Sequence, residues 1–261
     1  MITSTPVPTN DHAEHTRHRV GAMRGEVWLI LQTYQAQSLV RGRRRREDKP
    51  AIIGLLYFAD RLKTLWQAAR HDDPYADWWL IKIEQAIIQC RARLGRLFEQ
   101  FSTVLASQDS LHLTLAESSK PQRIDLQFAN PYAFRAAQML AEFDRLMCAV
   151  LTARHIGLAS SQTLDEHIHA SSRWLRGVFA LPLGYQCYDI DRVAVIRGAE
   201  RALEARERMG ELPDDILRGE TLPSLRPPPE RIFSTELPAM AVRDEGQEEP
   251  DRTSDTKADI P

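Results

Sequence analysis

The spacing of apolar residues predicts that most of the chain between residues 50 and 210 is helical. The clearest case is residues 50–70, where apolar positions from Ile52 to Trp66 recur at helical spacing. Asn130 followed by Pro131 is a strong helix start, because Asn accepts a free backbone N–H and Pro presets the first helical φ. The same reasoning predicts further helices over residues 78–105, 130–155, 163–179 and 191–209.

Three short segments carry strand-like patterns, near residues 27–33, 111–117 and 122–128. The first is so apolar that a strand and a helix both fit, and we expect a short buried strand that runs into a helix. The other two alternate with period two on either side of a turn at Glu117–Pro121, which predicts a hairpin or two strands of one small sheet. The predicted fold class is therefore mainly α (α+β), a helical body with a small antiparallel β-sheet or ribbon.

The two ends of the chain lack apolar periodicity. Residues 1–20 predict a disordered lead, and residues 221–261 predict a disordered acidic tail with many prolines. A single mostly helical domain is expected between them, over residues 21–220.

The charge of the chain is unevenly distributed. The formal net charge is -2, from 34 basic and 36 acidic residues, and 29 of the basic residues are Arg. Seven acids lie within residues 244–261, and without that segment and the first 16 residues 32 basic residues face 27 acidic ones. Near neutrality therefore does not exclude a nucleic-acid partner, and the tail is expected to compete with phosphate for basic residues.

A dense basic run precedes the first clear helix. Arg41, Arg43, Arg44, Arg45 and Arg46 fall within six positions, and Lys49 and Pro50 follow. Pro50 suits a first helical turn, so the run is expected to be a loop. Guanidinium groups bind phosphates in a bidentate manner, which points to DNA backbone contacts, and a merely solvated loop is an equally weighted alternative.

The segment 122–128 offers a candidate reading face. Arg123, Asp125 and Gln127 alternate with an apolar set, so they project from one side of a strand. Two such strands paired across a dimer would make a ribbon of the kind that some regulators insert into the major groove. The commoner arrangement, a half-buried sheet with a polar outer face, also fits.

Catalytic signatures are missing from the sequence. It has no Gly-rich nucleotide loop, no HExxH, no paired CxxC and no GxSxG. Asp72, Asp73 and Asp77 beside two Trp suggest paired carboxylates, but an Asp before Pro74 is better explained as a helix cap. We therefore expect no enzymatic activity.

Metal and cofactor sites are not expected either. The best metal candidate is Asp165 and His169, one helical turn apart with His167 between them, yet a third ligand on the same face is missing, and a solvated helix start fits better. Cys148 lies among apolar residues and is expected to be a buried thiol. The three scattered cysteines suit a reducing cytoplasm, and no segment is apolar enough to insert into a membrane.

Long stretches of the sequence resemble a known family. These are RGEVWLILQTYQAQSLVRGRRRREDKPAIIGLLYFADRLKTLWQAARHDDPYADWWLIKIEQAI, LQFANPYAFRAAQMLAEFDRLMCAVLTARHIGL and FALPLGY. They resemble conserved proteins of bacterial integrating conjugative elements, related to the AcaB-like regulators of conjugative plasmids. The resemblance covers roughly residues 20–225 and implies a dimeric ribbon-helix-helix DNA-binding protein that regulates transfer genes.

Pattern and resemblance together predict a cytoplasmic, dimeric protein that binds double-stranded DNA. Arg41–Arg46 and Lys49 would bind phosphates, and Arg123, Asp125 and Gln127 would face bases. The alternative is a non-enzymatic adaptor of the conjugation apparatus that binds other element-encoded proteins through amphipathic helices such as 50–70.

Overall fold

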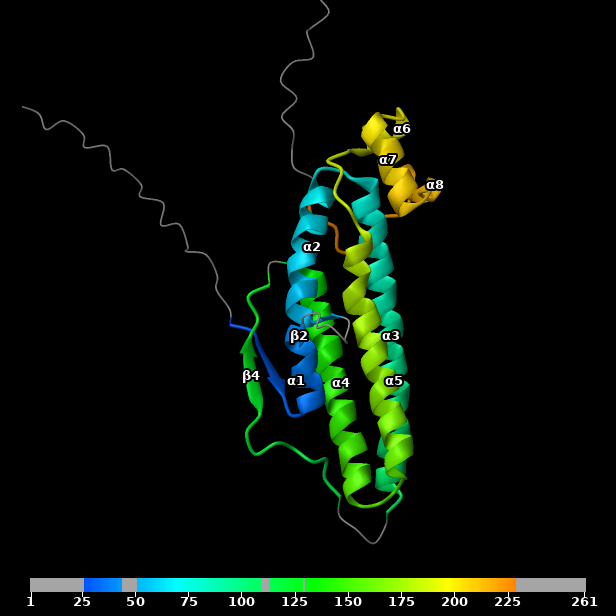
Figure 1. Ribbon diagram of the computed structural model, residues 1–261. Coiled ribbons are helices and arrows are strands. Elements are labelled where there is room, and N and C mark those ends of the chain that lie inside the picture. The colour runs from blue at the N-terminus through cyan, green and yellow to red at the C-terminus, as the bar shows by residue number, and fades with distance from the viewer. Residues whose placement is uncertain (1–25, 44–50, 109–112, 129, 229–261) are drawn as a thin grey trace, which may run out of the picture. The chain divides into compact units, whose positions relative to one another are not determined.

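The computed structural model describes residues 26–43, 51–108, 113–128 and 130–228. Four long helices form the body: α2 (Leu55–Arg70), α3 (Pro74–Ala106), α4 (Pro131–His155) and α5 (Ser161–Ala180). They lie side by side, and the shorter α1 (Tyr34–Arg41) contacts α2 and α4 (Figure 1). The compact unit that contains them ends at Pro229, and residues 230–261, a second unit, lie outside the described residues.

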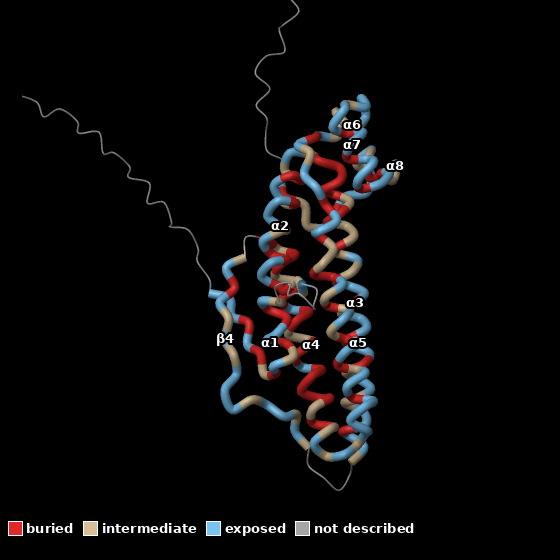
Figure 2. The backbone as a smooth tube through the Cα atoms, in the orientation of Figure 1, coloured by how far each residue is buried: buried red, intermediate tan, exposed pale blue. Residues whose placement is uncertain are grey.

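The core lies between these helices, and α4 is its most buried member (Figure 2). Small residues on α4, including Ala133, Ala136 and Ala149, are fully buried and let the neighbouring helices approach closely. The predicted apolar face of α2 is buried as well, since Leu55, Phe58, Leu62 and Leu65 have no exposed surface. A mainly helical fold with a small antiparallel sheet is therefore confirmed.

The strands pair differently from the prediction. β4 (Gln122–Asp125) pairs antiparallel with β1 (Trp28–Leu31), and two-residue strands β2 (Gly42–Arg43) and β3 (Ile52–Ile53) form a second pair. The described part of the predicted strand 111–117 is not a strand, so the predicted hairpin is wrong.

Side chains satisfy the backbone of that irregular segment. Ala116 N donates to Thr152 Oγ1 at 2.9 Å, and Ser118 N donates to Gln32 Oε1 at 3.0 Å. Leu113 and Leu115 still pack on the core, so their alternation reflects partial burial without strand pairing.

The C-terminal part of the unit consists of short helices. The 3-10 turn η1 (Leu181–Gly184) ends α5, and α6 (Arg192–Ile196), α7 (Glu200–Met209) and α8 (Asp214–Leu217) follow. One helix was predicted over 191–209, but Gly198 adopts a φ of 68° between α6 and α7 and ends the first of them. Gly210 terminates α7 as predicted, with a φ of 90°.

Residues 221–228 belong to the packed unit, although the sequence placed them in a disordered tail. Ser224 N donates to Glu84 Oε2 at 3.1 Å, and Leu225 N donates to Tyr132 Oη at 3.3 Å. Backbone N–H groups of the segment thus bind side chains of α3 and α4. A Pro-rich composition does not reveal such hydrogen bonds, so the sequence suggested disorder here. The other residues predicted to be disordered, 1–20 and 229–261, lie outside the described residues.

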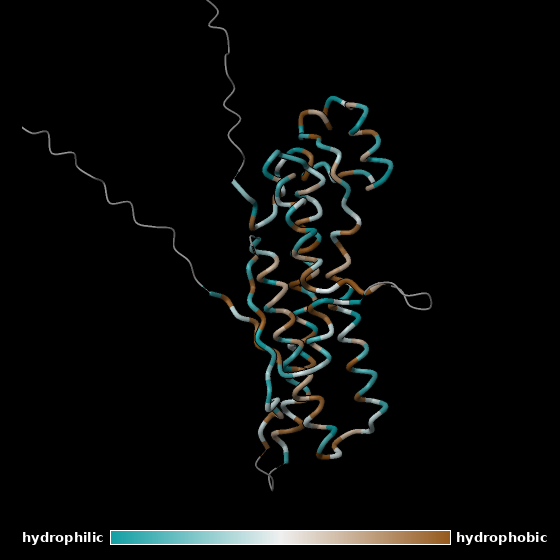
Figure 3. Tube along the Cα trace, turned by 60° about the vertical axis from the view of Figure 1, so that its left-hand side comes forward, coloured by the Kyte–Doolittle hydropathy of each residue, from teal (hydrophilic) through white to brown (hydrophobic). Residues whose placement is uncertain are grey.

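Hydrophilic and hydrophobic positions are interspersed along the long helices (Figure 3). None of the described helices is long and apolar enough to cross a membrane.

Candidate nucleic-acid interface

The pair of strands β1 and β4 forms a ribbon with one buried and one open face. Leu29 lies opposite Ile124 and Leu31 opposite Gln122 on the inner face, where Leu29 and Leu31 are only 5% and 2% exposed. On the outer face Trp28 lies opposite Asp125 and Ile30 opposite Arg123. We call these four outer residues, together with Gln127, the ribbon face.

The ribbon face carries both polar and apolar side chains. Arg123, Asp125 and Gln127 are all exposed, as expected from the alternation of the sequence. Trp28 and Ile30, on the partner strand, are 42% and 49% exposed. Large apolar side chains with this exposure are available for contact with another molecule.

Contacts within the ribbon face orient its polar groups. The Arg123 guanidinium lies 4.8 Å from the centroid of the Trp28 ring, and Trp28 Nε1 donates to Glu26 Oε2 at 3.1 Å. Gln127 Nε2 donates to Asp125 Oδ2 at 2.6 Å. Trp28 therefore supports Arg123 through a cation–π contact, which limits the rotamers of a long side chain.

A buried carboxylate fixes the ribbon to the bundle. Asp144, on α4, is 3% exposed and accepts hydrogen bonds from Gln32 N at 2.7 Å, Thr33 N at 2.9 Å and Thr33 Oγ1 at 2.6 Å. Thr33 in turn caps α1 by accepting from Ala36 N. Sequence reasoning missed Asp144, although a carboxylate between Phe143 and the apolar run LMCAV, one residue further on, was a signal.

Both strands of the ribbon come from one chain. The sequence left open whether strand 122–128 pairs with its own copy across a dimer or lies in a half-buried sheet of one chain, and β4 in fact pairs with β1, which precedes it by about ninety residues in the same chain. Each strand leads into a helix that packs in the bundle, β1 into α1 and β4 into α4 (Figure 1). β4 is half buried and its outward side is polar. Its sequence pattern therefore indicated which residues project outward, but it did not indicate which strand β4 pairs with.

Only the start of the basic run lies within the described residues. Arg41 is exposed in the last turn of α1, and Arg43 lies on β2, whereas Arg44, Arg45, Arg46 and Lys49 lie outside the described residues. Two glycines close the base of this segment. A Cβ on Gly42, whose φ is 68°, would lie 2.0 Å from Ile52 O, and one on Gly54 would lie 2.4 Å from Gly42 N.

The pair β2–β3 and the ribbon contact different long helices of the bundle. β3, which pairs with the strand that carries Arg43, contacts α5, whereas β1 contacts α4. Arg41, however, lies on α1, which contacts α4 as β1 does, so the start of the basic run shares α4 as a support with the ribbon that carries Arg123.

Comparison with known proteins agrees with this fold. The sequence profile of the family described as transcriptional regulator AcaB matches residues 19–229. The chain belongs to the AcaB family. A crystal structure of AcaB from uropathogenic E. coli, with selenomethionine, is similar to this chain with a TM-score of 0.53 and 14% identity. The alignment covers 75% of this chain and 95% of that one. No curated protein sequence matches significantly.

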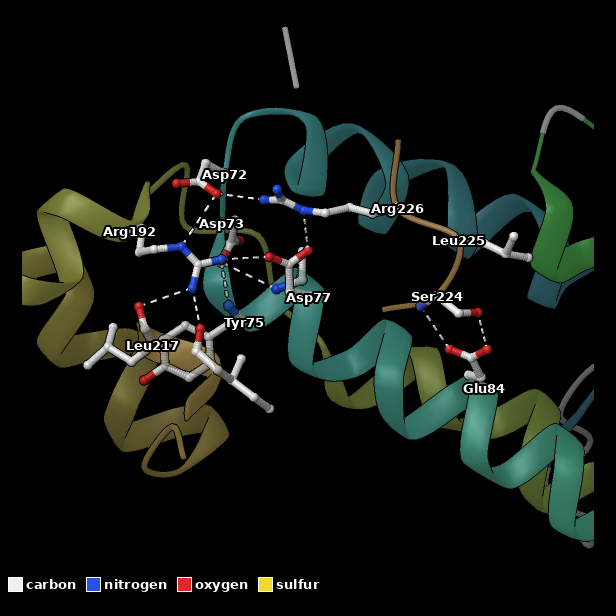
Figure 4. Close-up of polar contacts among 12 residues, drawn as sticks. Asp72, Asp73, Tyr75, Asp77, Glu84, Arg192, Leu217, Ser224, Leu225 and Arg226 are labelled. Atoms are coloured by element: carbon white, nitrogen blue, oxygen red, sulfur yellow. Dashed lines mark hydrogen bonds and ion pairs between the residues drawn. The ribbon is translucent and has the colours of Figure 1, made fainter. Parts of the chain in front are cut away.

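The carboxylates of HDDPYADWW, in this AcaB-family chain, form an ion-pair cluster. Asp77 has no exposed surface and accepts from Arg192 Nη2 at 2.7 Å and from Arg226 Nε at 3.0 Å (Figure 4). Arg226 Nη2 also donates to Asp72 at 2.5 Å. Asp72 and Asp77 are thus both paired with arginines, one from α6 and one from the segment 221–228. The cluster therefore joins α6 and that segment to the start of α3.

Asp73 has the capping role that the sequence predicted. It accepts from Tyr75 N at 2.8 Å and Ala76 N at 3.3 Å at the start of α3, and Tyr185 Oη donates to its other oxygen at 2.6 Å. Burial raises the pKa of the Asp73 carboxyl from 3.8 to about 6, although these three hydrogen bonds oppose the shift.

Arg192 completes the cluster by holding α8. Its Nη1 donates to the carbonyl oxygens of Ile216 and Leu217, the latter at 3.0 Å. The guanidinium thus satisfies carbonyls at the end of a four-residue helix while it pairs with Asp77. Sequence reasoning did not foresee either arginine partner.

Two side chains of the metal candidate contact other protein side chains. Arg154 donates to Asp165, and the His167 ring lies edge-on to Phe101 with centroids 5.5 Å apart. Among the described residues no three His, Cys, Asp or Glu side chains converge in a way that would hold a metal ion.

Cys148 is buried, as the sequence predicted. Burial raises the pKa of its thiol to about 11. Such a thiol is protonated at neutral pH and is a weak nucleophile.

Proposed function

We propose that this AcaB-family chain binds double-stranded DNA through the ribbon face and regulates transfer genes of a bacterial integrating conjugative element. The observation that carries the proposal is an exposed two-stranded antiparallel ribbon with Arg123, Asp125 and Gln127 on its open side. A two-stranded ribbon fits the major groove, where Arg recognises guanine and Gln recognises adenine by paired hydrogen bonds.

Membership of a transcriptional-regulator family supports the same function. The Arg bias of the chain supports it too, because guanidinium groups remain charged and bind phosphate at any cellular pH. Binding without turnover requires no cofactor and no catalytic group.

We further propose that Arg41, Arg43, Arg44, Arg45, Arg46 and Lys49 contact the phosphate backbone. The close backbone approach at Gly42 and Gly54 supports a fixed position for the end of α1, where the basic run begins. Replacement of the basic residues by Gln is expected to weaken binding to specific and random duplex alike, and to lower the salt slope by about one for each phosphate that is no longer neutralised. Unchanged affinity and slope would reduce the run to a solvated segment.

The main experiment is filter binding of the full chain to the element's own promoter and to random duplex across a salt series. We expect retention of both at low salt, a steep loss as salt rises, and tighter binding of the promoter. Arg123→Ala is expected to lower promoter affinity by at least about fivefold. Arg218→Ala is the matched control, because Arg218 is 65% exposed and lies near α8. Failure to retain either duplex at low salt would refute the proposal.

The adaptor alternative is less well supported, because one surface that it requires is not free to bind a partner. The apolar face of α2, which would engage partner proteins, faces the core. Copurification with proteins after nuclease treatment, without retained DNA, would favour the adaptor.

A further inference from the structure

The two strands of the ribbon present different chemistry to a DNA groove. β1 contributes Trp28 and Ile30 to the ribbon face, and β4 contributes Arg123 and Asp125, with Gln127 just beyond its end. One strand is thus apolar on its exposed side, and the other is charged and polar. A ribbon made from two copies of one strand would instead be two-fold symmetric, because both halves would carry identical side chains.

The elements that follow the strands are unequal as well. α1 has 8 residues and begins after a two-residue connection from β1, whereas α4 has 25 residues and begins after a five-residue connection from β4. No two-fold axis through the ribbon relates its two halves in sequence or in length. The symmetry of a DNA site mirrors the symmetry of the surface that reads it.

From these observations we propose that one chain reads an asymmetric, non-palindromic duplex element, with thymine-containing base pairs facing β1 and a guanine-containing segment facing β4. The proposal rests on the proposed DNA binding and specifies its substrate. Ile30 is an exposed aliphatic side chain suited to the thymine methyl group, which is the one apolar feature of the major groove. Arg123 carries the donor fork that matches guanine O6 and N7.

Trp28 acts as a positioning residue in this arrangement. Its ring lies under the Arg123 guanidinium, so it holds the donor fork of the opposite strand in place. Loss of the ring is expected to weaken discrimination at guanine while leaving the phosphate-dependent salt slope unchanged.

Selection from a randomised duplex library with the full chain tests the symmetry directly. We expect an enriched sequence without dyad symmetry and one chain bound for each copy of it, as measured by sedimentation of the complex. A palindromic sequence occupied by two chains would overturn the inference and leave DNA binding intact. Absence of any bound duplex at low salt would refute DNA binding itself.

A second measurement tests the assignment of the two strands. Replacement of each selected thymine by uracil removes only the methyl group, and at the position facing β1 it is expected to lower affinity about fourfold, the value for one buried methyl group. Ile30→Ala should abolish this sensitivity. Ile88→Ala is the control, because Ile88 is similarly exposed, at 58%, but lies on α3. Equal uracil sensitivity in wild type and Ile30→Ala would overturn the assignment of β1.

A protein interface is the competing use of the apolar half. If Trp28 and Ile30 pack against a second copy, Ile30→Ala will change the sedimentation coefficient of the free protein and leave uracil sensitivity as it was. That outcome would overturn the inference. Circular dichroism of both variants, expected to match the wild type, shows that an altered fold is not the cause.

Discussion

Burial changes the acid–base behaviour of Asp73 more than its hydrogen bonds do. The residue caps α3, yet the pKa of its carboxyl is raised to about 6, because desolvation penalises the charged form. In the unfolded chain the same group has a pKa near 3.8. The folded state therefore binds a proton more tightly than the unfolded state between these two values.

The sign of the pH dependence follows from this difference. As pH rises from about 4 to about 6, Asp73 ionises in the unfolded chain first, so its contribution to the free energy of unfolding falls and then stays constant above about pH 6. In the Asp73→Asn variant the side-chain oxygen can still accept from Tyr75 N, but the amide has no acidic proton and cannot ionise. We expect the stability of the wild type relative to Asp73→Asn to decrease across this window, as measured by urea unfolding at pH 4, 5, 6 and 7. A pH-independent difference would contradict the raised pKa.

Asp144 shows how one residue determines the position of a functional element. It is buried, and three hydrogen bonds from residues more than one hundred positions away make it a fixed point for the end of β1 and the start of α1. Its burial among apolar neighbours is tolerated because every bond it makes satisfies a backbone or hydroxyl donor.

At the scale of elements, the ion-pair cluster attaches the last described segment to the bundle. Arg226 contacts both Asp72 and Asp77, and Asp77 has no exposed surface. Removal of one cation from a buried carboxylate is costly, since the charge that remains is poorly solvated.

Arg226→Ala is therefore expected to lower the free energy of unfolding by about 2 to 3 kcal/mol, less than for a fully unpaired charge because Arg192 remains. The matched control is Arg218→Ala, whose partners Asp214 and Glu220 lie 3.6 and 3.7 Å away at an exposed site. Its effect should stay within about 0.5 kcal/mol. Urea unfolding of both variants measures the difference, and equal effects would show that the cluster does not anchor the segment.

Elements were predictable where local patterns determine them. Apolar periodicity located the long helices, and Asn130–Pro131 and Asp73–Pro74 marked two helix starts that the structure has at these positions. The predicted helix 191–209 failed at Gly198, because a positive φ interrupts a segment whose apolar spacing continues across it. The alternation of 111–117 was misleading, since partial burial produces the same period as a strand.

At the scale of the whole molecule, charge is segregated along the chain. Seven acids lie within residues 244–261, whereas the remainder beyond the first 16 residues has an excess of basic residues. If the acidic segment competes with DNA for arginines, its removal is expected to tighten binding to random duplex several-fold at low salt, with the gain fading as salt rises.

Truncation after Glu236, followed by filter binding across a salt series, tests this prediction. A full-length variant in which the acids of residues 244–259 are changed to Asn and Gln separates the effect of charge from that of chain length. Unaltered affinity in both proteins would exclude competition by the acidic segment.

The sequence alone determined where the long helices α2 to α5 lie, which face of α2 is apolar and which side chains of 122–128 project outward, because these features follow from local spacing and capping. Only the tertiary structure decided that β4 pairs with β1 and that Asp77 meets Arg226, 149 positions away. Backbone hydrogen bonds between strands are the same for every residue type, so a strand's pattern does not specify its partner. A buried charge likewise requires a partner without indicating where in the chain it lies, and packing of the helices makes that choice.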